Sequence, residues 1–329
     1  MKKMIEISYY PAISNTNQYC FFFRKALNAI GIVDDFSYRK SIKKLIKFQP
    51  YNYTIINWIE NDIISRTGHF YFIGFIKFLM KFLFIRLTSI KVVFVKHNEY
   101  PHPTKGSVSI CLAKCSIKLL EILSNIVIVH SPIYPEDHKH YYVPHPLYGV
   151  CTLNNPDGMD DNLYVNFGRI IRYKKTEELI AAFPDNKKLL IIGVCDDEDY
   201  LAELQRIIRN KNNIEIRAGY ISNEDAKMII SKSSGVIITH AEKNMIVSGS
   251  FFHSLTFSKR ILAIETPFLN WASAVFSPRV LVCFSSIKLM MDSVSLEKGA
   301  LDFQQTDINE ISQQFGNEKI ITLLKNIII

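Results

Sequence analysis

The sequence predicts an α/β protein of two domains, each a parallel sheet covered by helices. Short continuous apolar runs alternate with helical segments in both halves, a pattern typical of strands buried on both faces. With 329 residues, 48% of them hydrophobic, the chain is long enough for two cores. A segment rich in Gly, Asn, Asp and Pro lies between the halves. The expected divisions are a domain at 1–150, a linker at 151–163, a second domain at 164–305 and a helical segment at 306–329.

The first half carries four strand candidates, separated by helical or polar segments. Each strand candidate is a short run enriched in β-branched or aromatic residues. The predicted strands are Ile5–Tyr9, Tyr53–Trp58, Lys91–Val95 and Ile126–Val129. One helix should end near Gly31, and the apolar period predicts another over residues 107–124.

The second half repeats the alternation more regularly, with a turn residue after several strands. The predicted strands are Leu163–Phe167, Leu189–Ile192, Ile214–Arg217, Val236–Thr239 and Ile261–Ile264. The predicted helices are Thr176–Phe183, Asp197–Ile208, Asn223–Ser231 and Gly249–Phe257. This order predicts a doubly wound sheet, in which ligands bind beyond the carboxyl ends of the strands.

Residues 70–87 form a basic, aromatic segment of helical period. Its cations, Lys77, Lys81 and Arg86, recur at spacings that place them near one face, opposite Phe, Leu and Ile. Such a helix can lie in a bilayer interface, or it can pack on its own sheet with its cations in water. The repeated charges argue against a membrane-spanning helix.

The net charge is concentrated in the first half of the chain. Residues 1–150 contain 19 Lys and Arg against 9 Asp and Glu, whereas the whole chain has a net charge of +8. An excess of this kind indicates an anionic partner, which the residues alone leave open among lipid headgroups, a phosphorylated substrate and nucleic acid. The six scattered cysteines lack zinc-site spacing, and the first residues resemble a strand and not a signal peptide, so a cytoplasmic protein without metal is expected.

Two loops of the second half have the chemistry of a phosphate site. The strand ending at Phe167 leads into Gly168, where backbone can approach a ligand, and then to the cations Arg169 and Lys174. Two cations at this place suit a diphosphate that gains negative charge as a bond to it breaks.

The second loop joins the strand at Val236–Thr239 to the next helix. Three small residues stand at the helix start, where free amides and the helix dipole attract phosphate: Ser248, Gly249 and Ser250. Just upstream, Glu242 and Asn244 could hold sugar or ribose hydroxyls. A serine that merely caps the helix is the simpler interpretation, and it is compatible with phosphate binding.

The first half offers acid–base residues after its predicted strands. Histidine or a carboxylate can take a proton from an attacking hydroxyl, so His97 and Glu99 are the candidate catalytic bases. Asn15, Asn98, His102 and His145 are expected on the acceptor side. The histidines show no paired metal-ligand spacing.

Taken in order, Phe167-Gly168-Arg169, Lys174, Gly219-Tyr220-Ile221 and Ser248-Gly249-Ser250 resemble the donor-binding domain of GT-B glycosyltransferases. The resemblance is to bacterial enzymes of capsule, O-antigen and exopolysaccharide synthesis, and it is good over about residues 160–270. It implies two Rossmann-like domains whose parallel sheets face each other across a cleft. It also implies that Arg169 and Lys174 contact the donor diphosphate, and that Tyr220 and Ile221 lie near the base of the donor nucleotide.

This resemblance implies a metal-independent hexosyltransferase with no cofactor, whose co-substrate is a UDP- or GDP-linked sugar. The expected acceptor is a lipid-diphosphate-linked glycan, and the expected location is peripheral, on the inner face of the plasma membrane. One departure is that large retaining families carry Glu-x7-Glu here, whereas Ser250 occupies the second position. Two alternatives remain: a nucleotide-sugar epimerase of similar fold, and a non-catalytic basic binder of membrane or nucleic acid, although no nucleic-acid motif is present.

Overall fold

The computed structural model describes residues 4–12, 17–102, 104–153, 157–241, 246–299 and 301–329. The chain forms two compact units. The first contains the described residues within 1–146, 246–247 and 315–329, and the second contains those within 147–243 and 248–314. Each unit has its own six-stranded sheet, and every strand pair in both sheets is parallel.

The sheet of the first unit has the strand order β2-β1-β3-β4-β5-β6. Its strands are β1 (Glu6–Tyr10), β2 (Ile32–Asp35), β3 (Tyr51–Asn57), β4 (Ser89–Lys96), β5 (Ile126–Val129) and β6 (His140–Tyr142). Its helices are α1 (Gln18–Asn28), α2 (Tyr38–Ile46), the 3-10 turn η1 (Ile59–Ile63), α3 (Phe72–Thr88), α4 (Ser107–Leu123) and α12 (Asn317–Ile328). The chain leaves β1 toward β2 and then returns to β3 on the other side of β1, so the switch point of this sheet lies between β1 and β3.

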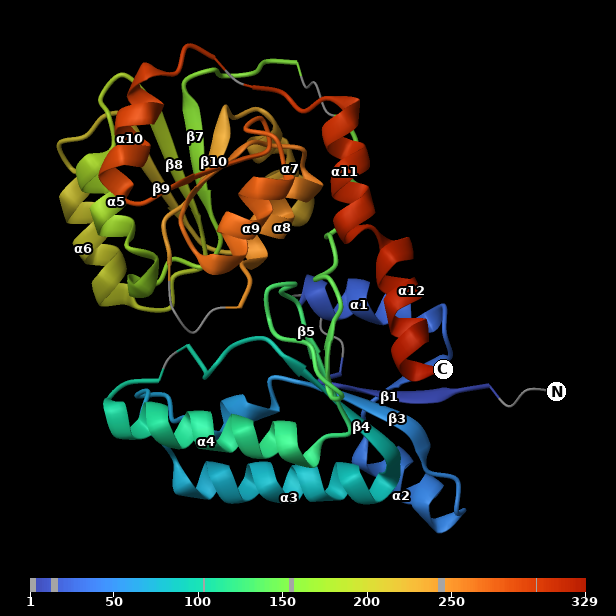
Figure 1. The fold of residues 1–329 in the computed structure, drawn as a ribbon. Coiled ribbons are helices and arrows are strands. Elements are labelled where there is room, and N and C mark those ends of the chain that lie inside the picture. The colour runs from blue at the N-terminus through green and yellow to red at the C-terminus, as the bar shows by residue number, and fades with distance from the viewer. Residues whose placement is uncertain (1–3, 13–16, 103, 154–156, 242–245, 300) are drawn as a thin grey trace. The chain divides into compact units, whose positions relative to one another are not determined.

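Helices cover both faces of this sheet. On one face α3 and α4 lie side by side over a core that includes Phe78, Phe94 and Ile117 (Figure 1). On the other face α12 packs against α1 (Figure 1). The hydroxyl of Tyr53 donates a hydrogen bond of 2.7 Å to the carbonyl of Ile328, which attaches the end of the chain to β3.

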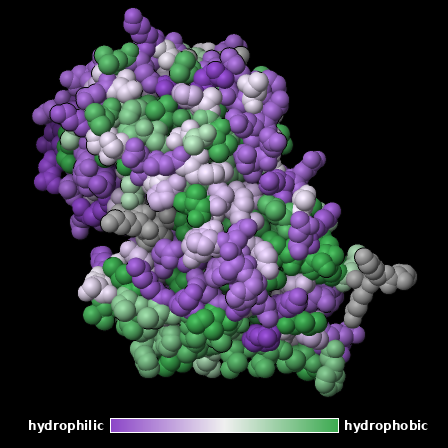
Figure 2. All heavy atoms as spheres, viewed as in Figure 1, coloured by the Kyte–Doolittle hydropathy of each residue, from purple (hydrophilic) through white to green (hydrophobic). Residues whose placement is uncertain are grey.

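The exposed surface of α3 differs from the basic stripe that the sequence suggested. Lys81 turns inward, where its ammonium pairs with Asp62 and donates a hydrogen bond of 2.9 Å to the Tyr10 hydroxyl, because Asp62 supplies a nearby opposite charge. The solvent-facing positions of the helix are instead mainly large apolar side chains: Phe72, Ile73, Ile76, Met80, Leu83 and Leu87. Apolar side chains gather over the α3–α4 side of this unit (Figure 2). Within the described residues, none of the helices has the length and hydropathy needed to cross a bilayer.

The second unit has the strand order β12-β11-β10-β7-β8-β9. Its strands are β7 (Leu163–Phe167), β8 (Lys188–Gly193), β9 (Ile214–Ala218), β10 (Gly235–Ile238), β11 (Ile261–Ile264) and β12 (Leu281–Phe284). Its helices are η2 (Arg172–Lys174), α5 (Thr176–Ala182), α6 (Glu198–Ile208), α7 (Asn223–Ser231), α8 (Gly249–Thr256), α9 (Pro267–Val275) and α10 (Ile287–Leu296), and α11 (Gln305–Phe315) follows them. Here the chain direction switches between β7 and β10.

The core of the second unit explains why its strands are so apolar. Helices α5, α6 and α10 pack on one face of the sheet through a buried cluster that includes Leu179, Tyr200 and Met290. Helices α7, α8 and α9 lie on the other face (Figure 1). Strands covered on both sides need no polar face, and this is the pattern seen in the sequence. The predicted α/β architecture of two parallel sheets is confirmed.

Candidate functional site

The switch point of the second unit brings three predicted residues together. Gly168 directly follows β7 and has a φ of +115°, a conformation that L side chains rarely adopt. A Cβ placed there would lie 2.9 Å from the Lys174 Nζ and 3.1 Å from the Ser250 Oγ. The Thr239 hydroxyl, just after β10, donates to the Lys174 carbonyl, and the Ser250 hydroxyl donates a 3.0 Å bond to the Phe167 carbonyl. The Lys174 ammonium and the start of α8 therefore lie beside the backbone of Gly168, which has no side chain.

Lys174 is the unusual member of this group. Only 8% of the residue is exposed, yet its Nζ makes no hydrogen bond or ion pair with any residue that the structure describes. Burial, followed by the nearby charge of Arg169, lowers the pKa of Lys174 to about 8. A buried ammonium without a partner is costly. The arrangement is suited to an anion that would lie beside Gly168 and supply the missing charge.

The start of α8 adds further donors at the same place. Ser248 is the N-cap residue, but its side chain makes no capping hydrogen bond, and its Oγ lies 3.2 Å from the Nε2 of His240. The first amides of α8, at Gly249 and Ser250, point along the positive end of the helix dipole. The simple capping interpretation of Ser248 therefore does not hold, and its side chain leaves the first amides of α8 unbonded, as a phosphate site at a helix start requires.

The structure places the other predicted donor residues in different situations. Arg169 is exposed and forms an ion pair with Asp196, so its charge already has a partner in the protein. Tyr220 is 73% exposed, and Ile221 is half-buried in the turn between β9 and α7. These two residues follow the edge strand β9, two strands away from Gly168. Glu242 and Asn244 lie outside the described residues.

The first unit contains a cluster of buried rings at the carboxyl ends of its strands. His97 follows β4 and stacks on Trp58 at 4.1 Å between ring centres. The ring of Tyr19 lies within 5.3 Å of each of three histidines, His97, His130 and His145. Trp58 has the left-handed φ of +51°, a strained conformation for a bulky residue that is often found at functional sites.

Hydrogen bonds determine the tautomer of His97. The Asn57 amide nitrogen donates a bond of 2.9 Å to the Tyr10 carbonyl, so the Asn57 oxygen faces the His97 Nε2 at 3.1 Å. The Nε2 must then carry the proton and donate, which leaves the Nδ1 with a lone pair. Burial first, and then the neighbouring His130 and His145, hold the pKa of His97 well below its usual value. His97 is therefore a neutral imidazole with one nitrogen able to accept a proton.

The two other histidines of the cluster are also fixed. The His130 Nδ1 donates a bond of 2.7 Å to the Val143 carbonyl, and its Nε2 accepts a bond of 2.8 Å from the Tyr19 hydroxyl. Burial lowers the pKa of His130 to about 4. The His145 Nδ1 donates to the Pro146 carbonyl at 2.8 Å. These bonds hold the rings of His130 and His145 in place around His97.

The remaining predicted residues of this half are less closely grouped. Glu99 forms an ion pair of 2.9 Å with the buried Lys96, whose ammonium also lies 3.0 Å from Glu121. Its charge is therefore already engaged, which favours His97 over Glu99 as the base. Asn98 and His102 are half-buried in the loop after β4. Asn15 lies outside the described residues.

Sequence reasoning missed the residues that orient these groups. Asn57 and Trp58 were not identified as site residues, although they stand at the end of a predicted strand, where ligands bind in such sheets. His130 directly follows the predicted strand Ile126–Val129, which is the same signal. Among the residues described, no three His, Cys, Asp or Glu side chains are grouped so as to hold a metal ion.

Comparison with known proteins finds solved structures that are similar to this one. No family model matches the sequence, and no curated protein matches it significantly. Anabaena Alr3699/HepE, solved in complex with UDP and glucose, is 11% identical, with a TM-score of 0.65 over 99% of each chain. Sucrose-phosphate synthase from Thermosynechococcus elongatus is 12% identical, with a TM-score of 0.69 over 98% of each chain. The lipopolysaccharide outer core galactosyltransferase WaaB is 10% identical, with a TM-score of 0.58 over 98% of each chain.

These similarities extend over nearly the whole length of the chain and of each solved structure. They therefore concern the complete two-unit architecture and not a single Rossmann-like unit. At 10–12% identity they establish a fold. The chain has the GT-B fold of two Rossmann-like domains, as the resemblance of its motifs implied.

Proposed function

We propose that this protein is a glycosyltransferase that takes a sugar from a nucleotide diphosphate donor. The observation that carries the proposal is the buried ammonium of Lys174, which has no partner among the described residues and lies beside Gly168 and the start of α8. A donor diphosphate supplies the anion that this ammonium lacks. UDP is the nucleotide we favour, because the similar HepE structure was solved with UDP and glucose.

The residues of each unit then have a role in the reaction. The bond between the sugar and the diphosphate breaks with its electron pair on the leaving oxygen, and Lys174 and the α8 amides stabilise that charge. The acceptor hydroxyl forms the new bond to the sugar and gives its proton to the Nδ1 of His97. In this scheme a cation and helix amides stabilise the leaving group, and no metal is required. The stereochemical outcome stays open, because Ser250 replaces the second Glu of the retaining pattern.

We further propose that the acceptor is a glycan carried on a lipid diphosphate, used in surface polysaccharide synthesis at the inner face of the plasma membrane. The support comes from the first unit, whose helices α2, α3 and α4 expose apolar side chains next to lysines. Exposed members include Ile46, Phe48, Met80, Leu83 and Val108. Apolar and basic side chains together favour a surface that rests on an anionic bilayer.

Two measurements test the enzymatic proposal. A thermal-shift screen of nucleotide diphosphates and their sugars should identify UDP or UDP-sugar as stabilising ligands. Lys174→Ala should abolish that shift and sugar transfer, whereas the adjacent, exposed Lys175→Ala should leave both near the wild-type level. Equal behaviour of the two variants, or stabilisation by no nucleotide at all, contradicts the proposal.

An epimerase of similar fold is separated by the reaction without acceptor. If the protein converts a nucleotide sugar into its epimer when no glycan is present, the transferase assignment is wrong. Transfer that needs a lipid-linked acceptor supports it.

A further inference from the structure

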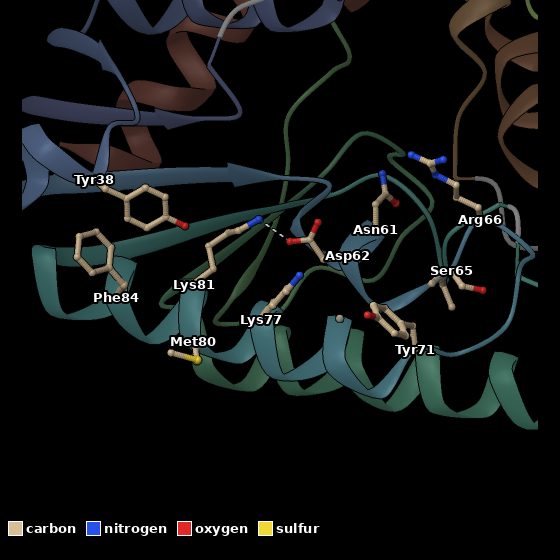
Figure 3. Close-up of a pocket in the computed structure, with 12 residues that line it drawn as sticks. Tyr38, Asn61, Asp62, Ser65, Arg66, Tyr71, Lys77, Met80, Lys81 and Phe84 are labelled. Atoms are coloured by element: carbon tan, nitrogen blue, oxygen red, sulfur yellow. Dashed lines mark hydrogen bonds and ion pairs between the residues drawn. The ribbon is translucent and has the colours of Figure 1, made fainter.

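A groove in the first unit lies outside the proposed transfer chemistry. It runs along α3, opposite η1 and the loop that follows it, and has a volume of about 1020 Å³. This volume is comparable to that of small-molecule sites in proteins. Its lining combines cationic, apolar and hydroxyl-bearing side chains, and Figure 3 shows how these residues lie. The functional residues described above do not line it.

Two cations of this groove have no partner. Lys77 on α3 and Arg66 in the loop are both exposed, and neither makes a hydrogen bond or ion pair with any residue that the structure describes. The third cation, Lys81, is paired with the one carboxylate of the lining, Asp62. The groove therefore has a net charge of +2 from Lys77 and Arg66, and it favours an anion.

The walls and floor of the groove are apolar and well defined. Tyr38 and Phe84 form one end, with 5.0 Å between their ring centres. At Gly74 the helix packs so closely on the loop that an added Cβ would lie 2.0 Å from the Asp62 carbonyl oxygen. Met80 lines the groove, yet 68% of it is exposed. It thus joins the groove to the apolar surface of α3.

The exposed apolar side chains of α3 favour an anion that also carries an apolar part. Ile73, Ile76 and Leu83 are exposed along the same helix and would contact the non-phosphate part of an amphiphile. A free phosphate or a nucleotide would use only the two cations and would leave these side chains in water. A phosphate ester with an attached hydrocarbon chain uses both features.

We propose that this groove binds the headgroup of an anionic glycerophospholipid of the bilayer, with the phosphate between Lys77 and Arg66. The glycerol backbone lies on Met80, and the acyl chains continue over the exposed face of α3. This site rests on the proposed membrane location of the enzyme and deepens it, because it adds a specific lipid contact to a general apolar surface.

The test uses the full chain and a soluble lipid, so that the surface potential of a bilayer does not contribute to the measured affinity. Dihexanoyl phosphatidylglycerol, kept below its micelle concentration, is titrated into the protein by calorimetry. Saturable binding at one site per chain is expected for the wild type. The double variant Lys77→Gln/Arg66→Gln should bind up to about 30-fold more weakly, which corresponds to the loss of two exposed ion pairs with the phosphate at the upper end of their usual contribution.

A matched variant controls for net charge. Lys43→Gln/Lys47→Gln removes two exposed charges from the helix α2 region of the same unit, outside the groove, and should change the affinity less than twofold. All four substituted side chains are exposed, so both variants should keep the wild-type melting temperature. If the control loses as much affinity as the groove variant, the site is not this groove.

Three further arms test the chemistry of the ligand. Dihexanoyl phosphatidylcholine should bind at least tenfold more weakly, since it has no net negative charge. Inorganic phosphate should not compete at concentrations that saturate the lipid; competition would assign the groove to a soluble anion and overturn the proposal. In flotation with phosphatidylglycerol vesicles, the groove variant should be lost from the lipid fraction at lower salt than the control variant. No nucleotide is present in these assays, so a failure here is distinct from a failure of the donor site.

Discussion

Replacing Lys174 by Met should make the ligand-free protein more stable and at the same time prevent it from binding its donor. Lys174 is buried, and its ammonium has no partner among the described residues. The pKa of this group is lowered from 10.5 to about 8. At about 1.4 kcal/mol per pKa unit, the charged form costs the native state about 3 kcal/mol at pH 7. Met retains most of the side-chain volume without the charge.

The dependence on pH follows from the direction of the shift. Between about pH 8 and 10.5 the unfolded chain binds a proton on this lysine that the native state has lost. The stability of the wild type should therefore rise with pH across this interval, and below pH 8 the full cost is present. In Lys174→Met this rise should be absent. The exposed neighbour provides the control, because Lys175→Met should retain the slope.

Hydrogen exchange is the suitable assay, since a chain of two units need not unfold in one step. Exchange of amides in β7 and β10 reports on the second unit alone. Lys174→Met should raise their free energy of opening by up to about 3 kcal/mol at pH 7. UDP at 100 times its Kd should add about 2.7 kcal/mol in the wild type and nothing in the variant. The reasoning is refuted if the variant is no more stable than the wild type at pH 7, or if UDP protects both equally.

Three further changes have defined outcomes. Burial raises the pKa of Glu60 to about 7, and its Oε2 has no hydrogen-bond partner among the described residues. The free energy of unfolding of the wild type should therefore fall as pH rises from about 4.5 to 7. Glu60→Gln should be more stable than the wild type by about 3 kcal/mol at pH 8 but not at pH 4, as measured by hydrogen exchange in β3 and β4. Gly168→Ala should abolish the thermal shift by UDP, because its Cβ would lie 2.9 Å from the Lys174 Nζ at a φ of +115°; an unchanged shift would contradict the donor site. His97→Ala should lower turnover by about 10²–10⁴-fold with the UDP shift retained, and turnover within threefold of the wild type would exclude His97 as the base.

The sequence predicts the central strands well, because they are buried on both faces. Ile126–Val129, Leu163–Phe167 and Ile261–Ile264 have the predicted bounds. Of the four edge strands, β9 was predicted, as Ile214–Arg217, whereas β2, β6 and β12 were not. Ile32–Asp35 contains two aspartates and pairs with one neighbour, and His140–Tyr142 has only three residues. A strand that pairs with a single neighbour at the edge of a sheet can be short and partly polar, so its sequence resembles that of a loop.

At the site, the sequence indicates which residues stand after which strand but not what they contact. Lys174 and Arg169 look equivalent as cations after β7. The structure separates them, because Asp196 from the next strand-to-helix loop pairs with Arg169, whereas no described residue pairs with the Lys174 ammonium. The same limit applies to Lys81, which the helical period places with the other cations but which Asp62 draws inward. Such pairings depend on residues distant in the chain, and a periodic pattern contains no information about them.

In both units the energetically unfavourable features lie near the point where the sheet changes direction. Between β7 and β10 it is the buried ammonium of Lys174, which no described residue pairs with, and beside β1 and β3 it is the left-handed backbone of Trp58 with neutral His97 stacked on it. Neither feature is needed to form a parallel sheet, and a methionine or a glycine at these positions would relieve the cost. Each one places a polar group at the edge where open α/β sheets bind ligands. The equivalent position of each feature in its own sheet therefore favours a functional origin over a structural one for both.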